Sequence, residues 1–405
     1  MQFGIDRLIS DPTLCRPLRG RRLALLGHPA SVTDDLRHSL DALAECPGLT
    51  LTAAFGPQHG LRGEKQDNMV ESLDYLDPLR NIPVFSLYGA VRRPTDAMMG
   101  TFDVLLVDLQ DLGCRVYTFI TTLLYVLEAS AAHGKEVWVL DRPNPIGRQV
   151  EGFLLEPGWE SFVGADRLPM RHGLTMGELA RWFVKTQKLD VDLRVVEMLG
   201  WEPSAPPGHG WPMLGRAWVN PSPNAPNLWM ARAYPGTVML EGTTLSEGRG
   251  TTRPLELFGA PGVDAGAILE YMEKTAPSWL HGCKVRPCWF EPTFHKHVGK
   301  LCEGIQIHTD GPYYDHDSFR PWRLLSLVFK AIRHLYPGYA LWRDFPYEYE
   351  VGRLAIDVIN GGTRLRAWVD DTEAGPEDLD AMASADEREW AETREDVMAY
   401  GGSAR

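Results

Sequence analysis

Five short runs of continuous apolar residues in the first third of the chain limit the folds that it can adopt. Their hydrophobicity is continuous rather than alternating, which is typical of parallel strands buried on both faces. Each run is flanked by helix-like or loop-like sequence. Strands and helices that alternate in this way predict an α/β fold, a Rossmann-like doubly wound parallel sheet. The runs are residues 22–26, 49–55, 82–87, 102–107 and 136–140.

Two helices are predicted beside these strands. One spans about 118–133, with hydroxyl residues at its start and Gly134 as its stop. The other spans 175–186 and is introduced by the sequence RHGLTMGELA. Between and after them the sequence is mixed, and residues 201–227 are rich in Pro, Gly and Trp, which favours an ordered loop because exposed aromatic residues are unfavourable.

The last third of the chain predicts a second, smaller α+β unit. It contains two strand-like segments, KVRPCWF and IQIHTD, and a helix-like segment, PWRLLSLVFKAIRHLY. An acidic, helix-prone stretch follows at 372–400. We therefore expect a Rossmann-like catalytic domain at 1–262 and a smaller C-terminal α+β domain, with an acidic C-terminal helix, at 263–405.

Composition and charge exclude several classes of protein. Apolar residues make up 44% and charged residues 23% of the 405 residues, so the chain can bury a proper core. The net charge of −13, without a basic run, argues against a nucleic-acid partner. No stretch is long and apolar enough for a signal peptide or a membrane span. The six cysteines form no CxxC pair, so we expect reduced thiols in a cytoplasmic protein.

The loop FGPQHGLRGEKQDN, residues 55–68, is the most polar of the segments that follow the predicted strands. Its glycines allow the backbone to approach a ligand, and its side chains supply acid, base, cation and amide groups. Polar residues also follow the other predicted strands. Because the carboxyl ends of parallel strands meet at one edge of a sheet, we expect a ligand site there. The residues are His28, Tyr88, Asp108, Gln110, Asp111, Arg115, Asp141, Arg142 and Asn144.

Familiar cofactor and nucleophile motifs are missing from the sequence. The first strand ends in LLGHPASV, without the GxGxxG of a dinucleotide site, and neither a P-loop nor a GxSxG elbow occurs. The histidines and aspartates at 295–317 lack the spacing of a metal site, so we predict neither cofactor nor metal. The segment SEGRGTT, 246–252, is either an anion cradle or an ordinary turn.

Carboxylates and arginines remain as the chemistry-bearing groups. Two carboxyl groups across a pocket are what glycoside cleavage requires, although single carboxylates more often cap helices or pair with arginine. Arg62, Arg115 and Arg249 offer forks suited to a substrate carboxylate, and an internal ion pair is the equal alternative for each. The candidate carboxylates are Glu64, Asp108, Asp111, Asp141, Glu178, Glu241, Glu247 and Glu256.

Ordered motifs along most of the chain resemble the exo-β-N-acetylmuramidase family. They include HGLRG (59–63), DLQDLGCRVYT (108–118), LDRPNPIG (140–147), RHGLTMGELA (171–180), PSPNAPN (221–227), the run 234–261, FHKHVGKLCEGIQIH (294–308), LYPGYALW (335–342) and YEYEVGRLAID (347–357). The resemblance implies a cleft between a larger and a smaller domain. It also implies release of N-acetylmuramic acid from the non-reducing ends of peptidoglycan fragments, in cell-wall recycling.

The resemblance also assigns roles to individual residues. It implies a small-molecule partner, a muropeptide or a MurNAc-containing disaccharide, whose hydroxyl and acetamido groups would meet His59, Tyr117, Asn144, His172 and Asn224. Arg62, Arg115 and Arg249 would bind its lactyl carboxylate. The family often carries a glutamate before the His-Gly pair, but here that residue is Gln58, and an amide is no general acid. Glu64 is then the first candidate acid, followed by Glu241 and Asp111.

Two alternatives come from other classes of function. Gln58 also fits a non-catalytic or altered muropeptide-binding homologue that has lost its acid. An oxidoreductase or sugar-phosphate enzyme that uses the Rossmann-like fold is the weakest alternative, because the dinucleotide fingerprint is missing.

Overall fold

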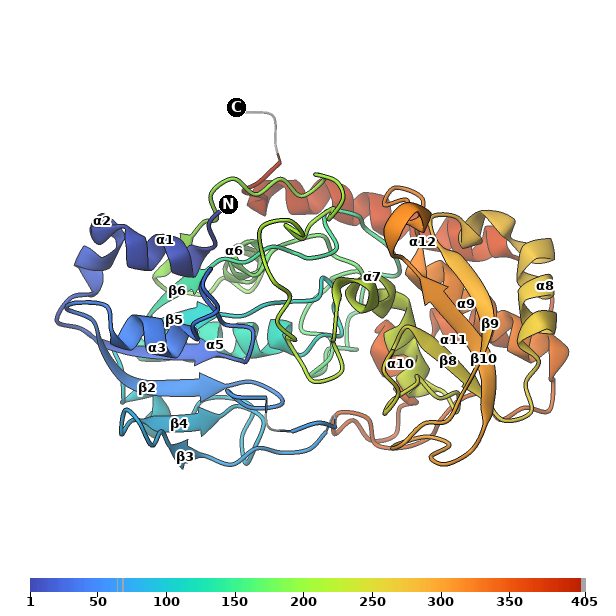
Figure 1. The fold of residues 1–405 in the computed structure, drawn as a ribbon, viewed down its shortest axis with the longest axis horizontal. Helices are drawn as coiled ribbons and strands as arrows, with labels where there is room; N and C mark the ends of the chain where they lie inside the picture. Colours follow the sequence, from blue (N-terminus) through green and yellow to red (C-terminus); the bar gives the residue numbers. More distant parts are fainter. Residues whose placement is uncertain (64, 68, 402–405) are drawn as a thin grey trace.

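The larger part of the molecule is built on a seven-stranded, mostly parallel sheet (Figure 1). The computed structural model describes residues 1–63, 65–67 and 69–401. The strand order is β3-β4-β2-β1-β5-β6-β7, and only the β3–β4 pair is antiparallel. The strands are β1 (Arg22–Gly27), β2 (Thr50–Gly56), β3 (Tyr75–Leu76), β4 (Pro83–Ser86), β5 (Val104–Asp108), β6 (Glu136–Leu140) and β7 (Leu193–Val196). The predicted α/β fold is thereby confirmed.

The six parallel strands follow the doubly wound order in which β1 and β5 are neighbours at the point where the winding reverses. All five residues of β5 are buried, as continuous hydrophobicity predicts for a central strand. All five predicted strands are present. The edge strands β3 and β7 were not predicted, because β3 has two residues and most of β7 is only partly buried.

Helices cover both faces of this sheet (Figure 1). Both predicted helices are present as α5 and α6. Gly134 ends α5 in the left-handed region at φ 59°, and Thr175 caps α6 in a reciprocal box with Glu178. The helices are α1 (Gly4–Ser10), α2 (Pro12–Cys15), α3 (Ser39–Ala44), α4 (Asp96–Met99), α5 (Phe119–His133), α6 (Met176–Thr186) and α7 (Leu228–Thr237).

The smaller part contains a three-stranded antiparallel sheet with helices packed around it, as the sequence predicted. Its strand order is β8-β10-β9, with β8 (Leu257–Ala260), β9 (Lys284–Phe290) and β10 (Cys302–His308). Its helices are α8 (Ala265–Thr275), α9 (Pro321–Leu335), α10 (Ala355–Asn360), α11 (Arg364–Asp370) and α12 (Pro376–Thr393). Strand β8 precedes residue 262 and pairs with β10 beyond it. The boundary at 262/263 stays a prediction.

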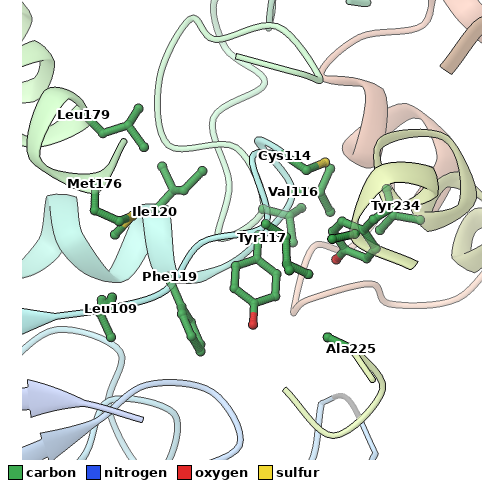
Figure 2. Close-up of a cluster of buried hydrophobic side chains, with 14 of the residues drawn as sticks. Leu109, Cys114, Val116, Tyr117, Phe119, Ile120, Met176, Leu179, Ala225 and Tyr234 are labelled. Carbon is green, nitrogen blue, oxygen red and sulfur yellow. The ribbon is translucent and has the colours of Figure 1, made fainter. Parts of the chain in front are cut away.

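Two features join the smaller part to the larger one. Helix α12 runs back along the larger part (Figure 1), where Trp390 packs edge-on against Trp182 at 4.7 Å between ring centroids. A cluster of buried hydrophobic side chains lies where the segment before α5 meets α6 and α7 (Figure 2), and α7 in turn packs against α9 of the smaller part. Tyr117 and Tyr234 stand in this cluster with their rings perpendicular, 6.1 Å apart.

Within the described residues, no helix has the length and apolar character needed to cross a bilayer.

Candidate active site

A small cavity of about 50 Å³ lies where loops from both parts of the molecule meet. The loop after β2, the segment before α5, the 222–224 segment, the short helix η2 (Val238–Gly242) and the 347–348 loop all contribute side chains. Six residues predicted for the site line it. Its polar lining consists of Gln58, His59, Tyr117, Thr118, Ser222, Asn224, Tyr234, Glu241, Arg249, Tyr347 and Glu348.

The loop after β2 reaches the cavity because glycine allows the chain to fold back sharply. A Cβ atom on Gly56 would lie 2.4 Å from the backbone nitrogen of Leu61, so no larger residue fits there. His59 and Gly60 then both adopt positive φ angles, 73° and 83°. This turn brings Gln58 and His59 inward, where both side chains are buried.

Glu348 is the carboxylic acid at the centre of the site. It is only 4% exposed, and its two oxygens accept hydrogen bonds from Gln58 Nε2 at 3.2 Å and from the Tyr88 hydroxyl at 2.7 Å. Burial raises the pKa of Glu348 to about 7, and the nearby charge of Glu241 adds to this, whereas the two hydrogen bonds oppose it. A substantial fraction of Glu348 is therefore protonated at neutral pH, as a general acid must be.

Gln58 holds this acid in place. The Thr118 hydroxyl donates to Gln58 Oε1 at 2.7 Å, so the amide NH₂ group faces Glu348. The amide thus acts as a neutral donor to the carboxyl group. A glutamate at position 58 would instead place a second carboxyl group against Glu348, and like charges at such distance cannot both ionise readily.

Glu241 supplies a second carboxylate, held by a buried ion network. Its oxygens contact Arg249 Nη2 at 2.5 Å and the Tyr347 hydroxyl at 2.7 Å. Arg249 Nε also donates to Glu247 at 2.9 Å. Although burial alone raises the pKa of Glu247, Lys296, His295 and Arg249 together hold it well below its usual value. The network therefore fixes charges of both signs beside the cavity.

His59 braces the loop after β2 from within, and Asn224 ties this loop to the opposite wall. His59 Nδ1 lies 2.8 Å from the Lys65 carbonyl oxygen, so this nitrogen carries the proton and Nε2 is left as an acceptor. Burial lowers the pKa of His59 to about 4, and the imidazole is neutral at pH 7. Asn224 Nδ2 donates to the Gln66 carbonyl at 3.0 Å.

Four residues predicted for the site lie away from the cavity, where backbone groups engage their side chains. Arg115 is buried and donates to the carbonyls of Phe153, Leu168 and Ile359, and burial lowers its pKa to about 10. Asn144 stabilises a turn, with its amide donating to the Leu174 carbonyl. His172 and Asp111 contact each other at 3.1 Å, and each also accepts from a backbone N–H. The catalytic role expected of Asp111 and the substrate-binding roles expected of Arg115, Asn144 and His172 stay predictions.

Two further residues of the predicted loop have other outcomes. Arg62 does not line the cavity, and its guanidinium lies 3.6 Å from the carboxylate of Asp77. Glu64, the first candidate acid from the sequence, lies outside the described residues. Its role stays a prediction. Within the described part of the chain, no three His, Cys, Asp or Glu side chains gather into a group that could hold a metal ion.

Glu348 was missed in the sequence, although it lies in the recognised motif YEYEVGRLAID. The motif contains two glutamates in identical Tyr-Glu contexts, and nothing local separates them. Only the tertiary structure shows that Glu348 is buried against Gln58 and Tyr88, whereas Glu350 lies outside the cavity. The feature that marks Glu348, a carboxylate buried among tyrosines, is therefore visible only in the structure.

Comparisons with known proteins match the chain along nearly its whole length. Residues 23–229 match the family described as "Exo-beta-N-acetylmuramidase NamZ, N-terminal", and residues 232–400 match its C-terminal counterpart. A curated relative, "Peptidoglycan beta-N-acetylmuramidase NamZ" of Bacillus subtilis (strain 168), is 41% identical over 338 residues, which cover 83% of this chain and 78% of the relative.

Solved structures share the fold. A DUF1343 family protein from Bacteroides fragilis NCTC 9343 superimposes with a TM-score of 0.85 at 29% identity, over 99% of both chains. A second protein of that family, from the same organism, gives a TM-score of 0.75 at 24% identity, again over 99% of both chains, and supports the fold alone. Taken with the matched sequence, these likenesses establish that the chain belongs to the exo-β-N-acetylmuramidase family of glycosidases.

Proposed function

We propose that this chain is an exo-acting glycoside hydrolase that releases N-acetylmuramic acid from the non-reducing end of peptidoglycan fragments in the cytoplasm. The relative from Bacillus subtilis supports the substrate class by its name. The observation that carries the proposal is Glu348, a buried carboxylic acid with its pKa raised to about 7, beside a second carboxylate, Glu241. Paired carboxyl groups of this kind are the machinery of glycoside hydrolysis.

Glu348 acts as the general acid in this proposal. Its proton passes to the glycosidic oxygen as the bond between that oxygen and the anomeric carbon breaks, so the leaving sugar departs as an alcohol. Glu241, held by Arg249 and Tyr347, supplies the negative charge that stabilises the positive charge developing on the sugar ring. A water molecule then adds to the anomeric carbon and releases one proton to the solvent, from which Glu348 takes up a proton again. Gln58 keeps the acid oriented and does not itself transfer a proton.

The lactyl carboxylate of muramic acid needs a cation, and Arg249 is the predicted arginine that lines the cavity. Its Nε and Nη2 atoms are taken by Glu247 and Glu241, so we assign Nη1 to the substrate carboxylate. Neutral groups of His59, Asn224 and Tyr117 remain for the hydroxyl and acetamido groups of the sugar.

The cavity must widen before a sugar can enter. Its 50 Å³ is comparable with the roughly 30 Å³ that one water molecule occupies in the liquid. The walls come from loops of both parts of the molecule, so small movements of these loops can enlarge it.

A non-catalytic muropeptide-binding protein is the second candidate function, and Gln58 is the observation that favours it. In that case the fold and the cavity would be kept, while the glutamate expected at position 58 is missing. The two candidates differ in whether Glu348 can take over the role of acid.

The deciding experiment measures hydrolysis of a 4-nitrophenyl β-N-acetylmuramide and of the disaccharide MurNAc-GlcNAc. We expect activity in the wild type, and in Glu348→Gln a loss of about 10²- to 10⁴-fold on the disaccharide, the range for a lost general acid. The 4-nitrophenyl glycoside should lose less, because its leaving group departs without a proton. Glu273→Gln, an exposed position on α8, is the matched control. Glu64→Gln tests the acid predicted from the sequence.

Each outcome separates the candidates. If the wild type binds the disaccharide in calorimetry without hydrolysing it, and Gln58→Glu gains activity, the binding protein is correct. If Glu64→Gln rather than Glu348→Gln abolishes hydrolysis, the acid is Glu64. Activity unaffected by Glu348→Gln contradicts the proposed mechanism.

A further inference from the structure

A wide groove of about 740 Å³ lies next to the small cavity. It runs between the segment 89–93, the side of α5, residues 160–165 and the 348–350 loop. Among the described residues, Glu348 alone lines both the groove and the cavity. The proposed acid therefore stands between a narrow space and a wide one.

This arrangement separates the two sides of a scissile bond. If the proposed function holds, the glycosidic oxygen lies against Glu348, with the terminal sugar on one side and the leaving group on the other. An enzyme that removes only a terminal residue needs a closed end for that residue and open space for the rest of the chain. From this geometry we propose that the groove binds the saccharide chain on the leaving-group side.

The lining of the groove has the mixed character that a sugar requires. The aromatic rings of Tyr125, Phe162 and Tyr349 contribute to its walls, and Tyr349 is 55% exposed. The Arg92 guanidinium lies 4.6 Å from the centroid of the Tyr349 ring, and Arg93 lies 3.6 Å from that of Tyr125. Each guanidinium group covers one face of its tyrosine ring, so the walls present aromatic edges beside charged groups. Such a mixed lining complements sugar rings, which combine C–H groups with hydroxyls.

The charges in the groove select an uncharged ligand. Arg92 approaches the carboxylate of Glu71 at 3.5 Å, and Arg93 pairs with Glu128. Glu160 and Glu350 line the groove as well, so carboxylates outnumber the two guanidinium groups. An anionic sugar beside Glu348 would be repelled, whereas the first sugar of the leaving group in MurNAc-GlcNAc is a neutral N-acetylhexosamine, whose hydroxyl and acetamido N–H groups can donate to these carboxylates.

The test compares a short and a long leaving group in the same variants. Tyr125→Ala and Arg93→Ala remove one wall of the groove away from the 347–349 loop, and Tyr313→Ala, an exposed tyrosine in the smaller part, is the control. We expect kcat/KM for MurNAc-GlcNAc to fall about threefold to tenfold more than kcat/KM for the 4-nitrophenyl glycoside. Equal losses on both substrates, or no loss on either, overturn the proposal.

A binding measurement keeps this test separate from the proposed function. Chitotriose is uncharged, and a trimer of galacturonic acid is an anionic saccharide of the same length. In calorimetry we expect the wild type to bind chitotriose and not the acidic trimer, and Tyr125→Ala to weaken this binding by the same threefold to tenfold. If the wild type hydrolyses neither muramide but this binding pattern is found, the proposed function fails and the groove stands. Absence of chitotriose binding, or equal binding of both trimers, overturns the groove.

Discussion

Glu348 is poised between its two protonation states because buried surroundings and two hydrogen bonds act in opposite directions. Burial and the charge of Glu241 favour the neutral carboxylic acid, while Tyr88 and Gln58 donate to the ionised form. The balance gives a pKa of about 7, where a general acid can both hold and release its proton. A small change among these neighbours should therefore be visible in the pH dependence of activity.

The first prediction concerns that pH dependence. Hydrolysis requires protonated Glu348, so kcat/KM should fall as the pH rises through about 7. In Tyr88→Phe the ionised carboxylate loses a donor, which raises the pKa of Glu348 and moves this limb to higher pH. The measurement is a pH–rate profile on MurNAc-GlcNAc, whose sugar leaving group needs the proton, with Tyr313→Phe as a control. A limb that stays in place or moves to lower pH contradicts the assignment of Glu348.

Ionisation of Glu348 should lower the free energy of unfolding at alkaline pH. The pKa of Glu348 is raised from 4.5 to about 7, so the folded state holds a proton that the unfolded chain releases. Its favourable contribution is complete below pH 4.5 and is lost as the pH rises through 7. At pH 8 the free energy of unfolding, measured by urea titration, should be higher in Glu348→Gln than in the wild type by up to about 3 kcal/mol. At pH 4 the two should differ little. An equal difference at both pH values would show that ionisation of Glu348 plays no part.

Single residues also show how far the sequence could be read. Gln58, His59, Asn224, Glu241 and Arg249 were predicted for the site and do line one cavity. They could be found because motif residues in glycine-rich loops have few structural reasons to be polar. Other polar residues of the same motifs bond to backbone groups and have a structural role, which only the tertiary contacts show. The motifs thus contain cavity-lining residues and structural residues side by side. Arg115, Asn144 and His172 are of this second kind.

At the scale of elements, strand ends were a reliable guide to the region and a poor guide to the residues. The loops after β2 and β4 bring Gln58 and Tyr88 to the site. Behind β5 and β6, however, Asp108 forms a buried ion pair with Arg142 at 2.6 Å. Asp141 accepts from the Thr175 hydroxyl at the start of α6. Strand-end polar groups therefore serve two purposes, and hydrophobic patterns do not distinguish catalysis from the anchoring of helices.

The acidic helix α12 gives a prediction at this scale. Trp390 is 2% exposed, packs edge-on against Trp182, and donates its indole N–H to the His172 carbonyl at 2.8 Å. Trp390→Ala should destabilise the protein by about 3–5 kcal/mol through the cavity it leaves, and should loosen α12 from the larger part. Limited proteolysis should then cut within α12 well before the rest of the chain. Arg388→Ala, exposed on the same helix, should leave the proteolysis pattern unchanged.

At the scale of the whole molecule, the site depends on how the two parts are held together. The cavity takes Gln58 and Tyr117 from the larger part and Tyr347 and Glu348 from the chain that follows the small sheet. A shift of one part against the other would separate Gln58 from Glu348. The residues that join the parts are therefore as necessary to the site as the residues that line it, even where they lie far from the substrate.

Arg115 gives the prediction that tests this dependence. Its guanidinium donates to the carbonyls of Phe153 and Leu168 in the larger part and to that of Ile359 in α10. Arg115→Met would remove the donor from the buried carbonyls of Phe153 and Ile359, at about 1–3 kcal/mol each, whereas the Leu168 carbonyl keeps its hydrogen bond from the Leu155 N–H. Calorimetry should show a lower Tm and a transition that broadens, as the two parts begin to unfold separately. Activity should fall even at temperatures where the variant remains folded, because the distance between Gln58 and Glu348 is no longer fixed.

In Arg388→Met, where an exposed arginine is removed, both Tm and activity should match the wild type. A variant of Arg115 with a lower Tm but full activity would show that the site tolerates movement between the parts.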